Sequence, residues 1–254
     1  MSTATQDVEV VWYGEAPASA PTLVFLHEGL GSAKQWRDFP ERIARATKLR
    51  AMADSRHGYG GSAAITLPRP LDYMQREAKE LLPRLLDELS ISSAILVGHS
   101  DGASIALVAA ATDAAPRVKA LVLEAPHVFV EDVSVASIAK AREAYETGDL
   151  RDKLAKHHGA NVDLAFRGWN EAWLDPEFRK WNIEEYLPRI EVPVLVIQGE
   201  SDPYGTRAQV DAIVRQAHGR VEVVMLADCG HAPHRERPVE TEAAMVAFLT
   251  PLAR

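Results

Sequence analysis

A serine in the segment Gly98-His99-Ser100-Asp101-Gly102 carries the clearest chemical signal in this chain. The aliphatic run 94–97 before it predicts a strand, and the small-residue run 103–110 after it predicts a helix. The two glycines allow a very tight turn between these elements, because side chains there would collide with the neighbouring backbone. Such a turn would hold the Ser100 hydroxyl in a strained position at the end of the strand, where it could attack a carbonyl carbon. The alternative is a glycine-rich turn whose serine has no chemical role.

Two further residues could activate this serine. A serine hydroxyl is a weak nucleophile near neutral pH, so it needs a base, and the base needs a carboxylate partner. Asp202 follows the buried strand predicted at 194–197, and His231 follows the strand predicted at 221–226. The chain order serine, aspartate, histidine is one of those in which such a triad occurs.

Other residues compete for these two roles. Asp202 could instead cap the helix predicted from Thr206, and His234 could replace His231 as the base. The other candidates for the acid are Glu124, Glu200 and Asp228. The two histidines could also be metal ligands, but no acid or cysteine lies at a ligand-like spacing and Pro233 separates them. We therefore expect no metal and no other cofactor.

The elements that would position these residues alternate between strands and helices. Strands are predicted at 8–13, 22–26, 49–53, 94–97, 118–123, 194–197 and 221–226. Helices are predicted at 33–47, 71–89, 103–111, 206–217 and 239–252, and Pro83 should kink or split the second of them. This alternation predicts an α/β fold with a mainly parallel sheet, helices on both faces and an antiparallel first strand at the edge. Active sites of such sheets lie beyond the carboxyl ends of the strands.

Residues 128–190 interrupt the alternation. They contain no convincing strand, but helical patterns occur at 133–147, 150–158 and 161–173, with a short turn at 184–187. We therefore predict an α/β core made of 1–127 and 191–254, and a helical cap of 128–190 inserted after the sixth strand of the sheet. Trp169 and Trp173 lie in this cap, where large aromatic side chains more often pack the cap onto the core than contact substrate.

Composition narrows the class of protein. The 254 residues are 47% hydrophobic and carry a formal net charge of −8, which disfavours nucleic acid and anionic membranes as partners. No apolar run approaches the roughly 18 residues of a membrane span, and the first residues show no pattern of a secretory signal. The single cysteine fits a reducing compartment. We expect a cytoplasmic protein, monomeric or homodimeric, whose partner is a small-molecule substrate.

Five motifs resemble those of one large family. They are His27-Glu28-Gly29-Leu30-Gly31, the segment 54–62, Gly98-His99-Ser100-Asp101-Gly102, Gly199-Glu200-Ser201-Asp202 and Gly230-His231. Over essentially its whole length the chain resembles the α/β-hydrolase fold superfamily. It is most similar to the small capped members: esterases, enol-lactonases, C–C bond hydrolases of ring-cleavage products and non-haem haloperoxidases. The resemblance implies that Ser100 is the nucleophile in a nucleophile elbow, Asp202 the acid and His231 the base.

The resemblance also implies two backbone donors for an oxyanion. One is the N–H of Asp101, and the other comes from the turn after the strand at 22–26, where Gly29 and Glu28 are the candidates. Family members usually have glycine after the histidine of this turn, whereas this chain has Glu28. A carboxylate there would oppose an oxyanion unless it points away or is paired. Candidates to line the substrate pocket are His27, His127, Trp169 and Trp173.

These observations favour a serine hydrolase that cleaves a small carboxylic ester or lactone through an acyl-enzyme on Ser100. One alternative keeps the triad but cleaves the C–C bond of a ring-cleavage diketone acid. Its anionic substrate would need a cap arginine such as Arg142, Arg167 or Arg179 in the pocket. A second alternative is a non-catalytic ligand-binding protein of the same fold, which the presence of all three triad residue types disfavours.

Overall fold

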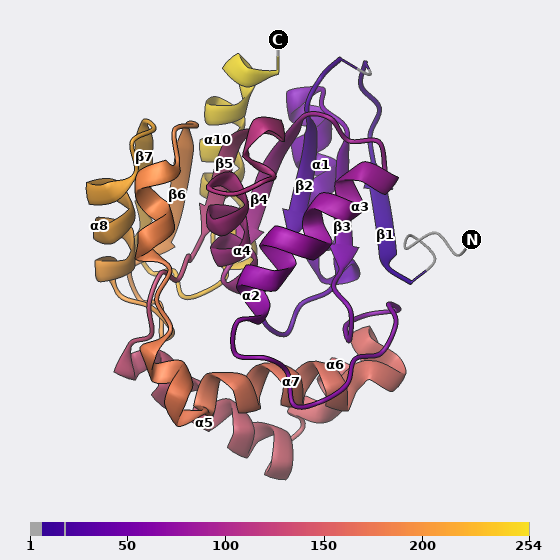
Figure 1. The fold of residues 1–254 in the computed structure, drawn as a ribbon, viewed down its shortest axis with the longest axis vertical. Helices are drawn as coiled ribbons and strands as arrows, with labels where there is room; N and C mark the ends of the chain where they lie inside the picture. The colour runs from indigo at the N-terminus through magenta and orange to yellow at the C-terminus, as the bar shows by residue number, and fades with distance from the viewer. Residues whose placement is uncertain (1–6, 18, 254) are drawn as a thin grey trace.

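The framework of the protein is one seven-stranded sheet in the order β1-β3-β2-β4-β5-β6-β7 (Figure 1). The computed structural model describes residues 7–17 and 19–253. The strands are β1 (Glu9–Tyr13), β2 (Thr22–Leu26), β3 (Ala51–Ser55), β4 (Ala94–His99), β5 (Val118–Glu124), β6 (Val194–Gly199) and β7 (Val221–Leu226). Only β1 is antiparallel to its neighbour, β3, and the other neighbouring strands are parallel. The predicted mainly parallel sheet with an antiparallel edge strand is confirmed.

Helices cover both faces of this sheet, as the alternating pattern predicted. The helices of the core are α1 (Phe39–Thr47), α2 (Tyr73–Arg76), α3 (Leu82–Glu88), α4 (Asp101–Ala110), α8 (Arg207–Gln216), α9 (Pro233–Glu236) and α10 (Pro238–Leu249). In Figure 1, α2, α3, α4 and α8 lie in front of the sheet, with α1 and α10 behind it. Shorter turns are η2 (Ala33–Trp36), η3 (Glu77–Leu81), η4 (Ala115–Arg117) and η8 (Thr250–Leu252).

The strand β2 shows why both faces must be covered. Every residue of β2 is buried. Val24 packs into the core beneath α3 and α4, whereas Leu23 and Phe25 pack into the core beneath α1 and α10. A continuous apolar run of this kind is the pattern of a strand that has helices on both sides. Each such side chain contributes roughly 1.5–3 kcal/mol by leaving water.

Two predicted helices are interrupted. The segment predicted as 33–47 forms η2 and then α1, separated at Arg37, whose φ is 55°. The segment predicted as 71–89 forms α2, a π-helical turn at η3, and α3. Pro83 lies in the first turn of α3, where its missing N–H interrupts the hydrogen-bond ladder. The predicted split at this proline is therefore observed.

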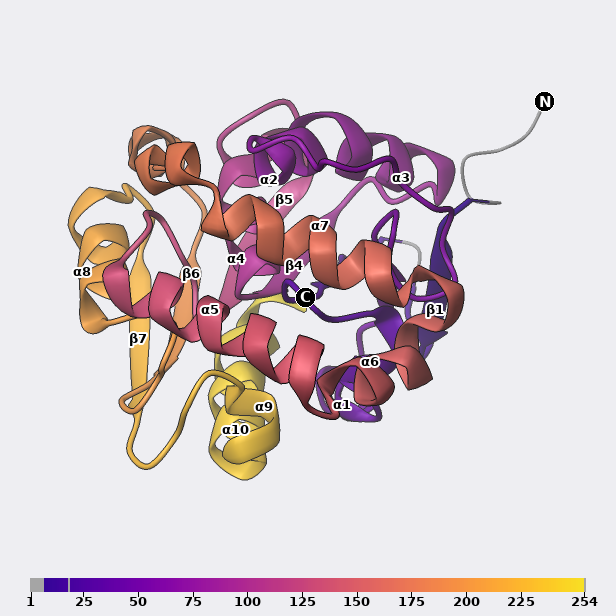
Figure 2. The same ribbon diagram turned by 90° about the horizontal axis from the view of Figure 1, so that it is seen from below.

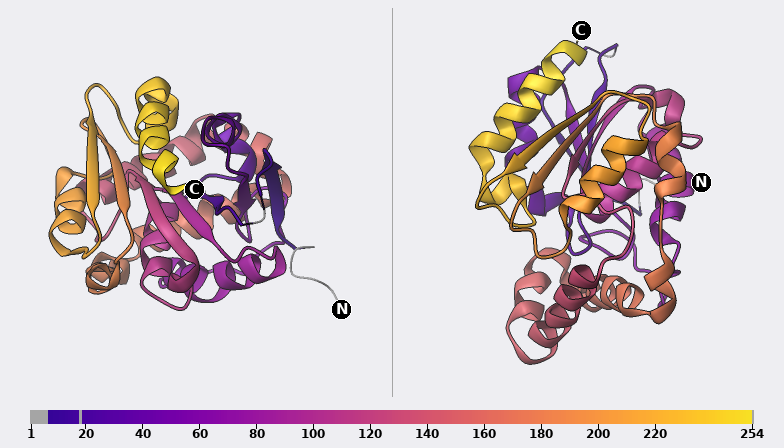
Figure 3. Two further views of the ribbon diagram at one scale, coloured as in Figure 1. Left: turned by 90° about the horizontal axis from the view of Figure 1, so that it is seen from above. Right: turned by 90° about the vertical axis from the view of Figure 1, so that its left-hand side faces the viewer.

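A helical insert covers the carboxyl ends of the strands. It contains α5 (Asp132–Thr147), α6 (Leu150–His158), η5 (Gly159–Asn161), α7 (Val162–Leu174), η6 (Pro176–Lys180) and η7 (Glu184–Arg189). Figure 2 shows α5, α6 and α7 lying across the end of the sheet, and the right-hand view of Figure 3 shows them gathered beyond that end. An isolated bridge between Phe129 and Asn182 joins the two ends of the insert.

The insert follows β5, the fifth strand in the part of the chain that the structure describes, and not the sixth. Five strands are also predicted before residue 128, at 8–13, 22–26, 49–53, 94–97 and 118–123, so only the stated ordinal was wrong. No described helix is both long enough and apolar enough to cross a membrane.

Candidate active site

Ser100 occupies the strained turn that its sequence predicted. Its φ is 55° and its ψ is −118°, a conformation that a non-glycine residue rarely adopts. A Cβ on Gly98 would lie 2.4 Å from the carbonyl oxygen of Gly102, and a Cβ on Gly102 would lie 2.0 Å from that of Leu26. Only glycine fits at these two positions. The turn therefore brings β4 and α4 close together and fixes Ser100 at the carboxyl end of β4.

Asp202 and His231 form a direct pair. The Nδ1 atom of His231 lies 2.9 Å from both carboxylate oxygens of Asp202. Asp202 also accepts hydrogen bonds from the side chain of Gln198 and the backbone N–H of Tyr204, both at 2.8 Å. Burial alone would raise the pKa of Asp202, but the hydrogen bonds from His231 and these neighbours lower it. The carboxylate thus stays ionised and holds the ring with Nδ1 as the donor, which leaves Nε2 as an acceptor.

Ser100 and His231 line the same pocket, together with residues of the cap. Within the described chain, no hydrogen bond joins the Ser100 hydroxyl to the His231 ring. Hydrogen bonds between catalytic groups are often long in unliganded enzymes and shorten when substrate binds. Asp202 contacts Nδ1 of the ring, and the ring lines the pocket that Ser100 also lines. Ser100 and the Asp202-bound ring of His231 thus share one pocket.

The rival acid and base form a second, separate pair. Glu124, fully buried at the end of β5, accepts hydrogen bonds from Nδ1 of His234 at 2.7 Å and from its backbone N–H at 3.2 Å. Neither residue lines the Ser100 pocket. Burial would raise the pKa of Glu124, but the His234 ring lowers it. The other two candidates, Glu200 and Asp228, have exposed side chains.

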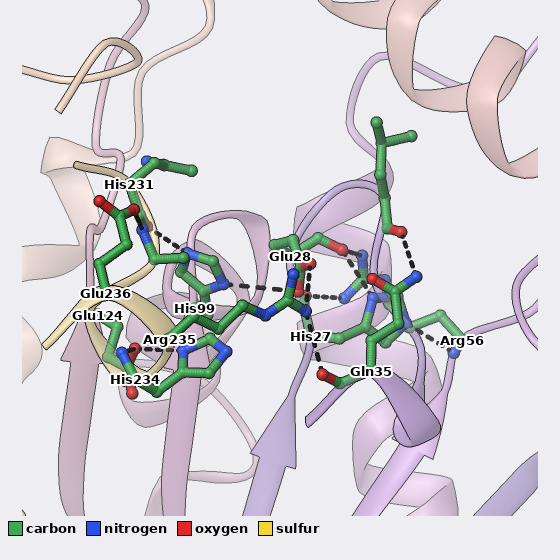
Figure 4. Close-up of polar contacts among 12 residues, drawn as sticks. His27, Glu28, Gln35, Arg56, His99, Glu124, His231, His234, Arg235 and Glu236 are labelled. Carbon is green, nitrogen blue, oxygen red and sulfur yellow. Dashed lines mark hydrogen bonds and ion pairs between the residues drawn. The ribbon is translucent and has the colours of Figure 1, made fainter. Parts of the chain in front are cut away.

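A free carboxylate at position 28 would oppose an oxyanion, but the Glu28 carboxylate is paired with two basic side chains. One carboxylate oxygen lies 3.5 Å from Nδ1 of His99, and the other lies 3.7 Å from the Arg235 guanidinium. Burial alone would raise the pKa of Glu28, but His99 and Arg235 lower it well below its ordinary value. The opposite nitrogen of His99 lies 2.6 Å from the carbonyl oxygen of His231, so Figure 4 shows one chain of contacts from Glu28 to the His231 loop.

The two predicted oxyanion donors lie at the same pocket. Asp101 is the first residue of α4, so its N–H belongs to the first-turn donors that have no partner inside the helix. Gly29 also lines the pocket, and a Cβ there would lie 2.2 Å from Nε1 of Trp169. This close approach holds the cap against the turn. The Asp101 side chain accepts a hydrogen bond from Tyr73, and burial raises its pKa although Arg56 opposes the shift.

Three of the four residues predicted to line the pocket do so. Trp169 and Trp173 of α7 form its roof, and His127 forms part of its wall. Burial, with a smaller contribution from the nearby His231, lowers the pKa of His127 to about 3, so this ring is neutral. His27 does not line the pocket. Its ring is fully buried, with Nδ1 2.7 Å from the Glu28 carbonyl oxygen and Nε2 accepting from the Arg56 N–H.

Several residues of the site were not predicted. The pocket is also lined by Leu30, Ser134, Ile138 and Tyr204. The Tyr204 ring packs against His231 at an interplanar angle of 42° with 4.6 Å between centroids, and its position two residues after Asp202 was an available signal. Glu236 accepts hydrogen bonds from the N–H groups of Gly230 and Ala232, on either side of His231, and no sequence pattern marked it.

The cap arginines do not reach this pocket. Arg142 and Arg167 line a separate groove on the cap, where Arg142 donates to Asn170. Arg179 forms an ion pair with Asp132. Within the described residues, no arginine or lysine lines the Ser100 pocket, whereas Glu28 and Asp101 do. The same described residues contain no group of three or more His, Cys, Asp or Glu side chains placed to hold a metal ion.

Comparison with known proteins agrees with this architecture. A solved structure from a study of Nitrososphaera gargenis carboxylesterases matches with a TM-score of 0.77 and 18% identity, covering 99% of this chain and 98% of that chain. The enol-lactonase from Burkholderia xenovorans LB400 matches with a TM-score of 0.72 and 23% identity, covering 96% of each chain. At these identities the similarity concerns the fold.

Among curated proteins, the serine hydrolase BPHL of Homo sapiens is 28% identical over 199 residues, which represent 75% of this chain. The match spans 66% of that relative, just under two thirds of its length. The model of the alpha/beta hydrolase family matches residues 23–244. This match covers most of the sheet and the whole insert, and it shows that the chain belongs to the alpha/beta hydrolase family.

Proposed function

We propose that this protein is a serine hydrolase that cleaves a small carboxylic ester or lactone through an acyl-enzyme on Ser100. The observation that carries the proposal is the Asp202–His231 pair, whose ring lines one pocket with the strained Ser100. Membership of the alpha/beta hydrolase family supports a hydrolytic activity.

In the proposed reaction, His231 accepts the Ser100 proton at Nε2 while the serine oxygen attacks the carbonyl carbon. Asp202 keeps the proton on Nδ1 and stabilises the imidazolium. The N–H groups of Asp101 and Gly29 donate to the oxyanion, and loss of one such donor typically costs on the order of 10²–10³ in rate. His231 then protonates the leaving alcohol. A water molecule, activated by the same ring, hydrolyses the acyl-enzyme and releases the acid.

The pocket favours a small and uncharged acyl group. Its volume is about 90 Å³, smaller than the apolar cavity of about 150 Å³ that holds benzene in another protein. Leu30, Ile138 and the two tryptophans of the cap supply an apolar wall. Asp101 would repel an anionic substrate, and no described arginine or lysine lines the pocket to attract one. These features favour an ester or lactone over the diketone acid of the C–C bond hydrolases.

The proposal is tested with chromogenic p-nitrophenyl esters of increasing acyl length. We expect kcat/KM to be highest for acetate or butyrate and to fall for octanoate, because the pocket is small. Ser100→Ala should remove the activity, whereas Ser201→Ala, which changes an exposed serine beside Asp202, should leave it. A fluorophosphonate probe should label the unchanged protein at Ser100 and fail to label Ser100→Ala. Full activity of a folded Ser100→Ala variant would refute the proposal.

A further inference from the structure

A second cavity of about 170 Å³ lies between β3 and the segment formed by η3 and α3. In Figure 1 this segment crosses in front of β3. The cavity shares no lining residue with the Ser100 pocket. Its apolar walls are formed by Val8, Leu26, Leu81, Leu82, Leu85 and Ile105. In another protein an apolar cavity of about 150 Å³ holds benzene, so an apolar group of about six carbon atoms fits in this cavity.

Two buried side chains at this cavity have polar atoms without partners. Asp54 is 5% exposed and Arg56 is 4% exposed, and both line the cavity. Among the described residues, Oδ1 of Asp54 and Nε of Arg56 make no hydrogen bond. Buried polar atoms are almost always hydrogen-bonded, so the unpartnered acceptor of Asp54 marks a place where a donor from a ligand or water would complete the structure.

Arg56 does not neutralise Asp54 by direct pairing. Its terminal nitrogens donate to the backbone carbonyls of His27 and Glu28, which fixes the guanidinium against the turn beside the active site. No ion pair joins Asp54 to Arg56 in the described structure. The buried Asp54 carboxylate is therefore attracted electrostatically by Arg56 but forms no direct ion pair with it.

The charges around the cavity are mainly negative. The lining carboxylates are Asp7, Asp54, Glu77 and Glu88, and the lining guanidinium groups are Arg56 and Arg84, with His57 beside them. Burial raises the pKa of Asp54 to about 7, with Glu77 raising it and Arg56 lowering it. Burial also raises the pKa of Glu77. A cation beside these two carboxylates would keep both ionised, whereas an anion would face four like charges.

We propose that this cavity binds a small primary alkylammonium ion, with the ammonium beside Asp54 and Glu77 and the aliphatic chain along the leucines of η3 and α3. The cavity has carboxylates for the ammonium end of such a ligand and apolar side chains for its aliphatic end. The ammonium supplies donors to Asp54, and the chain fills the apolar volume. This site is independent of the proposed hydrolase activity, because the two pockets are separate.

The test is isothermal titration of the full-length protein with n-hexylammonium chloride, hexan-1-ol and sodium hexanoate, which share one chain and differ in charge. We expect n-hexylammonium to bind at least about tenfold more tightly than hexan-1-ol, and hexanoate to bind most weakly. Asp54→Asn and Glu77→Gln should each weaken n-hexylammonium binding at least about tenfold and leave hexan-1-ol binding nearly unchanged. Glu80→Gln, an exposed change in the same turn, should have no effect.

Two further variants keep the test decisive. Leu81→Trp should fill the cavity and abolish binding, and it provides a second readout if Asp54→Asn does not fold. Ile138→Trp, which narrows the Ser100 pocket instead, should leave the binding intact. Equal affinities for the ammonium and the alcohol would overturn the proposal. So would n-hexylammonium binding that survives both Glu77→Gln and Leu81→Trp, or no binding of n-hexylammonium by the unchanged protein.

Discussion

The two histidine–carboxylate pairs allow the same chemical change to be made at the proposed catalytic acid and at a position outside the Ser100 pocket. Asp202→Asn and Glu124→Gln each replace a buried carboxylate by its neutral amide, and each carboxylate contacts Nδ1 of a histidine at 2.7–2.9 Å. We expect Asp202→Asn to lose activity and keep its fold. We expect Glu124→Gln to keep its activity and lose stability.

The size of each effect follows from the contacts. Asp202 accepts from His231, Gln198 and the Tyr204 N–H, so an amide NH₂ there would face at least one donor and would favour the wrong tautomer of His231. In a Ser-His-Asp enzyme the corresponding change lowers kcat by roughly 10⁴, or about 5.5 kcal/mol. Within the described residues, the Glu124 side chain hydrogen-bonds to His234 alone, and neither side chain lines the pocket. Loss of its charge should cost about 2–3 kcal/mol of unfolding free energy.

The assay is ester hydrolysis under saturating substrate together with urea unfolding of the same preparations. A fall in kcat of at least about 10³ in a natively folded Asp202→Asn protein would support the assignment. A folded Glu124→Gln protein with the larger loss of kcat, beside an active Asp202→Asn protein, would refute it and make Glu124 the acid.

Three smaller changes test the surroundings of the site. Gly29→Ala places a methyl carbon 2.2 Å from the Trp169 indole, so kcat/KM should fall at least about tenfold, and adding Trp169→Ala should restore part of it. Glu28→Gln should lower the unfolding free energy by about 1 kcal/mol at pH 6. Burial alone would lower the pKa of His99, but Glu28 raises it. The Glu28–His99 pair is therefore fully charged below the ordinary His pKa. The difference in unfolding free energy between the unchanged protein and Glu28→Gln, measured with urea, should shrink as pH rises through the raised pKa of His99. Gly98→Ala places a methyl carbon 2.4 Å from a carbonyl oxygen of α4 and should cost at least about 3 kcal/mol in the same measurement.

The sequence was sufficient to predict elements whose pattern is local. The cap helices α5 and α6 lie within one residue of their predicted bounds, because apolar periodicity and the glycines at 148 and 159 mark their ends. The elbow was equally local, since the two glycines that permit it flank Ser100 directly. The break between η2 and α1 was missed, because the apolar pattern continues across the left-handed residue Arg37.

The contacts of the site are non-local, and this limits what a single sequence can predict. Glu124 and His234 are 110 positions apart, and Asp202 and His231 are 29 apart. Both carboxylates follow buried strands that end at the same edge of the sheet. Chain position therefore could not determine which histidine contacts which acid. The pairing depends on the paths of the two loops, which only the structure describes.

The glutamate at position 28 shows how the fold accommodates a departure from the family pattern. A free carboxylate at the proposed oxyanion turn would oppose the reaction, but Glu28 is paired with His99 and Arg235. His99 lies within the elbow itself, and its other nitrogen contacts the His231 carbonyl oxygen. His99 therefore connects the Glu28 turn and the His231 loop, and it directly precedes Ser100. Replacing Glu28 by glycine would restore the common pattern of the family, yet it would leave His99 without the partner that orients it.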